Sequence, residues 1–318
     1  MQDRAAFSNP SREGTVLRAL LLFNPNATTT DDRVRDVIAS ALASAVDLDV
    51  QATKQRGHAT HIVAGAVHEG VDAVFALGGD GTANEVLQAL AGTDILLGLI
   101  PGGGANVLAR ALGLPNDAVA ATSVLLDHLR SGRSRTITLG RAAGRYFGFN
   151  AGFGFDAAVV RHVEQHGQVK KALRQLAFVW STVTEWTTGE GREGPSMSLE
   201  TDDGTTAGPF QIAIVANADP YTYLGSQAMH VHPDASFDEG LDLVTIEEVH
   251  TAALLGIVAR VFRDGSHVRN KHVTYHHDLD RFTLTSPHPL PLMVDGDYAG
   301  EHTAVTFEAV RGALRVLA

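Results

Sequence analysis

The stretch that decides the fold is "FALGGDGTANEV", residues 75–86. An apolar run leads into three glycines and one aspartate, and a run with helical spacing follows. Glycine allows the backbone to approach a ligand or another segment closely, and the start of a helix presents unbonded N–H groups. We therefore expect a strand to end and a helix to begin here, with the carboxylate of Asp80 inside the turn.

Strand and helix patterns alternate on both sides of this stretch. Apolar or alternating runs predict strands, and apolar residues at helical spacing predict helices. The strands are expected at 16–23, 46–53, 71–77 and 94–100, and the helices at 31–45, 58–70, 82–92 and 105–114. Such alternation with short joins is typical of right-handed crossovers onto a parallel sheet covered on both faces.

The pattern changes near residue 134, where short strands with turn signals begin. Helical stretches interrupt these strands at about 156–187 and 250–265. The pattern favours an antiparallel β-sandwich. We predict a disordered arm at 1–14, a parallel α/β domain at 15–138 and a β-sandwich domain at 139–318. The last residues are expected to pack back on the first domain.

Composition excludes several classes of protein. The 318 residues contain no cysteine, which excludes disulfides and thiolate metal sites and fits a reducing cytosol. The net charge of −11 argues against a nucleic-acid binder, and it requires any membrane contact to be local. No signal peptide and no apolar stretch long enough to span a bilayer is evident.

Two glycine loops follow predicted strands and open predicted helices, at 78–82 and 101–106. Backbone N–H groups at a helix start, with little side-chain bulk, form a phosphate cradle. Two neighbouring cradles could hold a polyphosphate. Asp80 would repel the phosphates unless a cation lies between, and Mg²⁺ commonly has this role.

Other patterns support simpler interpretations. Thr82 and Glu85 fit a capping box, which needs no ligand. Residues 152–157 imitate a dinucleotide fingerprint, but they lie in the β-rich half, and we interpret them as a tight turn. Residues 168–186 combine two tryptophans with basic residues. This segment could lie at a membrane interface or pack on the sandwich as a helix.

An ordered set of motifs resembles the diacylglycerol kinase catalytic-domain family of bacterial lipid kinases, related to sphingosine and ceramide kinases. The motifs run from about residue 17 to the end and include "LLFNPNA", "GGDGTANEVLQAL", "LGLIPGGGANVLARALGLP", "PYTYLGS", "FDEGLDLV" and "VDGDYAGE". GGDGT alone is shared with phosphofructokinases and NAD kinases, whereas the ordered set is specific. The resemblance implies a Rossmann-like, phosphofructokinase-like first domain, ATP bound between the domains, and transfer of its γ-phosphoryl group to a lipid hydroxyl.

The resemblance also implies roles for particular residues. The positions that match nucleotide-binding residues are Asn24, Pro25, Asn26, Thr53, Gly79, Asp80, Gly81, Thr82, Asn84, Glu85, Gly103, Gly104 and Asn106. The implied metal residues are Asp80 together with Ser236, Glu239 and Leu241, which match a structural magnesium site. The family usually has aspartate at the middle position of that site.

Two departures from the family affect the expected chemistry. The family's Asn-Asp after the second loop is Asn106-Val107, which looks more like the sphingosine and ceramide kinase branch. The family's Asp-Gly-Glu, whose glutamate acts as the base, is Asp295-Gly296-Asp297. Asp297 is therefore the aligned base, one methylene shorter, and Glu301 is a candidate helper. Asp80 is a competing base.

We therefore predict an ATP- and Mg²⁺-dependent lipid kinase, cytoplasmic and peripheral at the inner membrane face, acting on a diacylglycerol-like or sphingoid lipid. The partners are a lipid at the membrane surface and no nucleic acid, and the sequence leaves open a homodimer. One alternative is a soluble kinase like NAD kinase. Another is a nucleotide- or lipid-binding protein without turnover, which the glutamate-to-aspartate departure supports.

Overall fold

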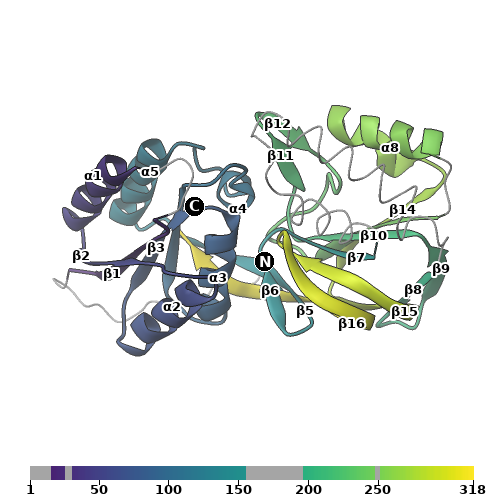
Figure 1. Cartoon of the computed structure of the whole chain (residues 1–318), viewed down its shortest axis with the longest axis horizontal. Coiled ribbons are helices and arrows are strands. Elements are labelled where there is room, and N and C mark those ends of the chain that lie inside the picture. The colour runs from purple at the N-terminus through teal and green to yellow at the C-terminus, as the bar shows by residue number, and fades with distance from the viewer. Residues whose placement is uncertain (1–15, 26–30, 155–195, 248–250) are drawn as a thin grey trace, which may run out of the picture.

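The structure is a computed structural model that describes residues 16–25, 31–154, 196–247 and 251–318, drawn as ribbons in Figure 1. The predicted arm at 1–14, Asn26 and the 168–186 segment lie outside the described residues. The predicted fold class is confirmed. A parallel α/β part occupies one end of the molecule and an antiparallel β part the other (Figure 1).

The first domain is a parallel sheet with helices on both faces (Figure 1). Its strands are β1 (Arg18–Phe23), β2 (Asp47–Ala52), β3 (Ala73–Gly78) and β4 (Leu96–Pro101), in the order β4-β3-β1-β2. Its helices are α1 (Asp32–Ala43), α2 (His58–His68), α3 (Asp80–Leu90), α4 (Val107–Ala111) and α5 (Ala118–Ser131). Helix α5 packs against α1 and was not predicted, although Asp117 caps its first turn by accepting from the N–H of Ala120.

The second domain is mainly antiparallel. Its strands are β5 (Arg135–Ala142), β6 (Arg145–Phe147), β7 (Asn150–Gly154), β8 (Met197–Thr201), β9 (Thr206–Phe210), β10 (Ile212–Ala216), β13 (Leu241–Ile246), β14 (Val273–Leu279), β15 (Arg281–Val294) and β16 (Asp297–Val316). A separate hairpin pairs β11 (Thr222–Leu224) with β12 (Gln227–Met229), and α8 (Thr251–Arg263) is followed by a short 3-10 helix, η3 (Ser266–Arg269).

One prediction in this domain is wrong. Gly152 and Gly154 do not form a tight turn, because both lie in β7, a buried strand that pairs with β10 on one side and β15 on the other. A Cβ on Gly154 would already touch Met197 and Leu290, so the strand is closely covered at this position.

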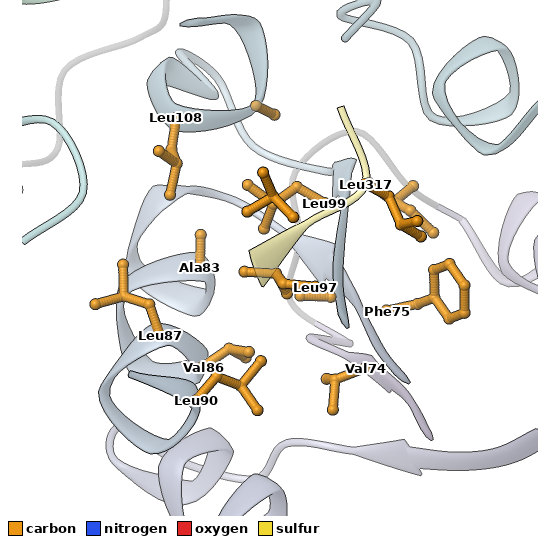
Figure 2. Packing of buried hydrophobic residues seen from close by; sticks show 14 of the residues in the cluster. Val74, Phe75, Ala83, Val86, Leu87, Leu90, Leu97, Leu99, Leu108 and Leu317 are labelled. Atoms are coloured by element: carbon orange, nitrogen blue, oxygen red, sulfur yellow. The ribbon is translucent and has the colours of Figure 1, made fainter. Parts of the chain in front are cut away.

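Strand β16 joins the two domains into one 14-stranded sheet. Its first part pairs with β15, its second part pairs with β5, and its end also runs parallel to β4, where Arg315 lies opposite Leu96. The N–H of Leu317 then donates to the carbonyl of Leu97 at 2.9 Å. The C-terminus is therefore part of the first domain's core, beside Leu97 and Leu99 (Figure 2).

Helix α3 has its apolar side in that core. Ala83, Val86, Leu87 and Leu90 repeat at helical spacing, and they face the strand residues Val74 and Leu97, whereas Phe75 points to the opposite face of the sheet (Figure 2). Burial of these side chains anchors the helix that follows the first glycine loop. Of the remaining residues of α3, some line a cavity and others contact the second domain.

Candidate active site

The two glycine loops lie directly against each other. A Cβ on Gly103 would fall 2.7 Å from the Cα of Gly79, and a Cβ on Gly78 would fall 2.6 Å from the hydroxyl oxygen of Thr82. No real Cβ tolerates such contacts, so glycine is required by the packing of loop on loop and of loop on helix. The glycines that were expected to approach a ligand therefore first allow the two loops to approach one another.

Asn106 holds the second loop in place. Its Oδ1 accepts from the N–H of Gly103 at 2.9 Å, and its Nδ2 donates to the carbonyl of Gly103 at 3.0 Å and to Asn116 Oδ1 at 2.7 Å. The N–H of Gly102 donates to Gly78 at 2.8 Å. Two amides of the predicted second cradle are thus bonded within the protein.

Asp80 is the first residue of α3, and its side chain faces α4. Its Oδ1 accepts from the N–H of Leu108 at 3.3 Å. Burial raises the pKa of Asp80 to about 6, although backbone N–H groups of Leu108, Val107 and Asn106 act in the opposite direction. Asp80 therefore connects the first loop to the helix after the second loop.

A cavity of about 270 Å³ opens between the domains at the start of α3. Gly81, Thr82 and Glu85 form one wall, and Asp297, the first residue of β16, comes from the other domain. The remaining lining residues are Asn24, Thr53, Lys54, Gln55, Arg56 and Ala59. The cavity therefore brings together six of the predicted residues: Asn24, Thr53, Gly81, Thr82, Glu85 and Asp297.

Glu85 caps a helix other than its own. Its two carboxylate oxygens accept from the N–H groups of Gly57 and Ala59, at 2.7 and 3.0 Å, at the start of α2. A carboxylate at this position satisfies unbonded N–H groups and is stabilised by the helix dipole. The capping-box interpretation is wrong, because α3 begins at Asp80 with Gly79 as its N-cap, which places Thr82 inside the helix.

Asp297 lies between two arginines. Its Oδ1 is 2.5 Å from a guanidinium nitrogen of Arg56, and its Oδ2 is 3.6 Å from one of Arg145. Arg56 belongs to the first domain and Arg145 to the second. Glu301, the candidate helper, is an exposed residue of β16 and does not line the cavity.

Asn84 does not line the cavity either, because it faces the second domain. Its Nδ2 donates to Asp295 Oδ2 at 2.8 Å, and its Oδ1 accepts from Arg145 at 3.2 Å. One turn further, Gln88 exchanges two hydrogen bonds with the backbone of Tyr146, at 2.8 and 3.0 Å. Helix α3 therefore carries the contact between the domains as well as one wall of the cavity.

Sequence reasoning missed four residues of this region: Lys54, Arg56, Arg145 and Asp295. The basic residues of "TKQRGH" directly follow Thr53, which was assigned to the nucleotide, so they could have been included. Nothing local to Arg145 indicates that it reaches Asp297.

The implied metal residues fall into two separate places. The N–H of Glu239 donates to the carbonyl of Ser236 at 3.2 Å in the turn before Leu241, and the Glu239 carboxylate lies 3.5 Å from His277 Nε2. Asp80 faces α4 instead. Within the described ranges, no group of three or more histidine, aspartate or glutamate side chains is arranged to hold a metal ion. The metal roles of Asp80, Ser236, Glu239 and Leu241 therefore stay a prediction.

Two family descriptions match this chain. Residues 18–142 match the diacylglycerol kinase catalytic domain, and residues 150–318 match the YegS C-terminal NAD kinase beta sandwich-like domain. A diacylglycerol kinase of Mycobacterium tuberculosis is 30% identical over 81% of each chain. One of Bacillus subtilis is 27% identical over 89% of this chain and 90% of that protein.

Solved structures show the same fold. A putative diacylglycerol kinase from Bacillus anthracis superposes with a TM-score of 0.76 at 21% identity, covering 98% of both chains. An NAD kinase from Archaeoglobus fulgidus in complex with ATP gives a TM-score of 0.51 at 12% identity, covering 95% of this chain and 94% of that one. The resemblance found in the sequence is confirmed.

Proposed function

This chain belongs to the diacylglycerol kinase family, and on that premise we propose that it transfers the γ-phosphoryl group of ATP to a hydroxyl group of a lipid. The observation that carries the proposal is the cavity between the domains, in which Asp297 of β16 faces the first turn of α3. A helix start and a carboxylate on opposite walls suit a phosphoryl donor on one side and an alcohol on the other.

The nucleotide phosphates are proposed to lie at Gly81 and Thr82. Both residues line the cavity in the first turn of α3, where backbone N–H groups and the helix dipole favour negative charge. A Cβ on Gly81 would meet no atom within 4 Å, so space remains beside its backbone. Asn24 and Thr53, at the ends of neighbouring strands β1 and β2, are proposed to contact the rest of the nucleotide. Mg²⁺ is proposed to arrive with the nucleotide, held chiefly by phosphate oxygens and water.

Asp297 is proposed to act on the acceptor. The lipid hydroxyl oxygen attacks the γ-phosphorus, the bond from this phosphorus to the bridging oxygen breaks, and its electron pair leaves with ADP. The hydroxyl proton passes to a carboxylate oxygen of Asp297. In such reactions positioning and charge stabilisation supply most of the catalysis, so orientation of the carboxylate by its arginines matters as much as its basicity.

The test is incubation with labelled ATP, Mg²⁺ and separate lipids in mixed micelles, among them diacylglycerol, a sphingoid base and ceramide, followed by separation of products. We expect label in one lipid class, and we expect Asp297→Ala to lower the rate by about 10²–10⁴-fold. If the Ala variant phosphorylates lipid at the full rate, Asp297 is not the base.

A second candidate function is that of a soluble kinase acting on NAD. It is favoured only by the likeness of fold to an NAD kinase. Label transferred to NAD and to no lipid would establish it in place of our proposal. None of the helices in the described part of the chain is long and apolar enough to cross a bilayer.

A further inference from the structure

Both carboxylates that line the cavity already have partners within the protein. Its lining includes two cationic residues, Lys54 and Arg56, and two carboxylates, Glu85 and Asp297. Glu85 is bonded to the start of α2, so the N–H groups there are occupied by a protein carboxylate. An anion that enters the cavity therefore meets the side chains of Lys54 and Arg56 rather than the start of α2.

Arg56 is held by Asp297 across the gap between the domains. The ion pair spans 2.5 Å, and the Arg56 side chain is 68% exposed while that of Asp297 is 22% exposed. An ion pair with one partner so exposed contributes little net stability. A triphosphate carries more negative charge than one carboxylate, and a guanidinium binds phosphate oxygens with two parallel hydrogen bonds. Phosphate can therefore displace the carboxylate.

We infer that Arg56 binds the phosphates of the nucleotide, and that it leaves Asp297 to do so. This inference rests on the proposed function. Without nucleotide, Arg56 neutralises Asp297 and blocks one of its oxygens. When nucleotide binds, the guanidinium moves to phosphate, and that oxygen becomes accessible to the acceptor hydroxyl. The carboxylate is then ready only when a phosphoryl donor is present, which disfavours binding of an acceptor alone.

Arg145 is suited to a different role. It also lies within 4 Å of Asp297, but it donates to the side chain of the buried residue Asn84 and is only 35% exposed. It belongs to the same domain as Asp297. Arg145 therefore keeps the second oxygen of Asp297 oriented while Arg56 moves.

A thermodynamic cycle on nucleotide binding tests the exchange. The full-length protein and the variants Arg56→Ala, Asp297→Ala and the double variant are titrated with Mg²⁺-ATP, and separately with inorganic tripolyphosphate, by calorimetry. We expect Arg56→Ala to weaken binding by about 10-fold, the worth of one charge-assisted contact. We expect Asp297→Ala to strengthen binding by about two- to five-fold, because Arg56 no longer has to be displaced.

The double variant gives the decisive result. If Asp297 opposes binding through Arg56, its removal brings no gain once Arg56 is absent. An equal gain in both backgrounds would mean that Asp297 simply repels phosphate, and it would overturn the exchange. Undiminished binding by Arg56→Ala would overturn the phosphate contact. Asp297→Asn repeats the cycle with a side chain of the same shape, and circular dichroism checks that each variant is folded.

Arg311→Ala is the matched control, because Arg311 makes an exposed ion pair of 2.7 Å with Asp278 outside the cavity lining. It should bind nucleotide as the unchanged protein does. The cycle is independent of the acceptor. If it behaves as expected while no lipid is phosphorylated, the proposed function fails and the role of Arg56 in nucleotide binding stands. If lipid is phosphorylated and the cycle is additive, the proposed function stands and the exchange of Arg56 between Asp297 and phosphate fails.

Discussion

Asn84 and Asp295 are joined by a buried hydrogen bond of 2.8 Å that connects the two domains. Asp295 also accepts from the N–H groups of Gly148, Phe149 and Asn150, at 2.7 to 3.1 Å. Asp297 follows two residues later and lines the cavity. The position of the proposed base relative to α3 is therefore set by a carboxylate that does not line the cavity.

Replacing Asp295 by alanine should strongly destabilise the protein. Four buried donors lose their acceptor at once, and an unsatisfied buried polar group is costly, so we expect a loss of about 3 kcal/mol in the free energy of unfolding. Urea unfolding measures the loss. Asp280→Asn is the control, because the Asp280 side chain lies in an exposed ion pair with Arg311, whose loss should change stability by less than about 1 kcal/mol. Equal effects of the two changes would contradict the role of Asp295.

Asp80 should make stability depend on pH. Burial raises its pKa in the folded protein to about 6, above the ordinary value of 3.8, so the folded state binds more protons between these two values. Relative to Asp80→Asn, the free energy of unfolding should therefore fall as the pH rises from about 4 to about 6. The total fall should be at most about 3 kcal/mol, and the difference should stay constant above this window.

The control for this titration is Asp203→Asn. Hydrogen bonds from Thr201 and Thr205 lower the pKa of the exposed Asp203 carboxyl. The contribution of Asp203 to the free energy of unfolding is therefore lost as the pH falls, whereas that of Asp80 is lost as the pH rises. Urea midpoints of the three proteins across pH 4 to 7 separate the two effects. A difference between wild type and Asp80→Asn that is flat, or that grows with pH, would show that the carboxyl is not held in a desolvating site.

Gly103→Ala should separate the two glycine loops. The new methyl group would lie 2.7 Å from the Cα of Gly79 and 3.0 Å from Asn106 Oδ1, so backbone must move. Overpacking of this kind costs about 1–3 kcal/mol, and we expect nucleotide binding to weaken as well, because α3 starts at this contact. In Gly65→Ala, within α2, the methyl group meets nothing within 4 Å, and stability should rise slightly. Thermal unfolding compares the pair, and a tolerated Gly103→Ala would refute the close packing.

The sequence predicts the strands, helices and glycine loops around this site better than it predicts the side-chain contacts between the domains. Apolar runs and helical spacing predict the parallel sheet, and the spacing of the glycine loops places both of them at one edge, because these signals are local. Asn84 and Asp295 are 211 residues apart, and no local pattern relates them. The same holds for Asp297 and Arg56, so the aligned base is identified by resemblance while its ion pair is not.

Glu85 shows how a local motif can mislead. Glu85 lies three residues after Thr82 and satisfies the capping pattern, yet its carboxylate accepts from the N–H groups of Gly57 and Ala59. It does so because α2 packs beside α3, and the N–H groups at the start of α2 need an acceptor. Sequence spacing cannot distinguish these two helix starts. Only the packing of the helices decides which one the carboxylate serves.

Glu85→Ala should therefore loosen α2 rather than α3. Loss of a helix cap costs about 1–2 kcal/mol, and the segment of Lys54 and Arg56 that leads into α2 should lose protection as well. Hydrogen exchange followed by mass spectrometry should show faster exchange at residues 54–60 than at the start of α3. Glu69→Ala is the control at the other end of α2, where a carboxylate opposes the helix dipole and its removal should not destabilise. Faster exchange confined to 80–84 would instead indicate that Glu85 stabilises the first turn of α3, as a capping box does, and not the start of α2.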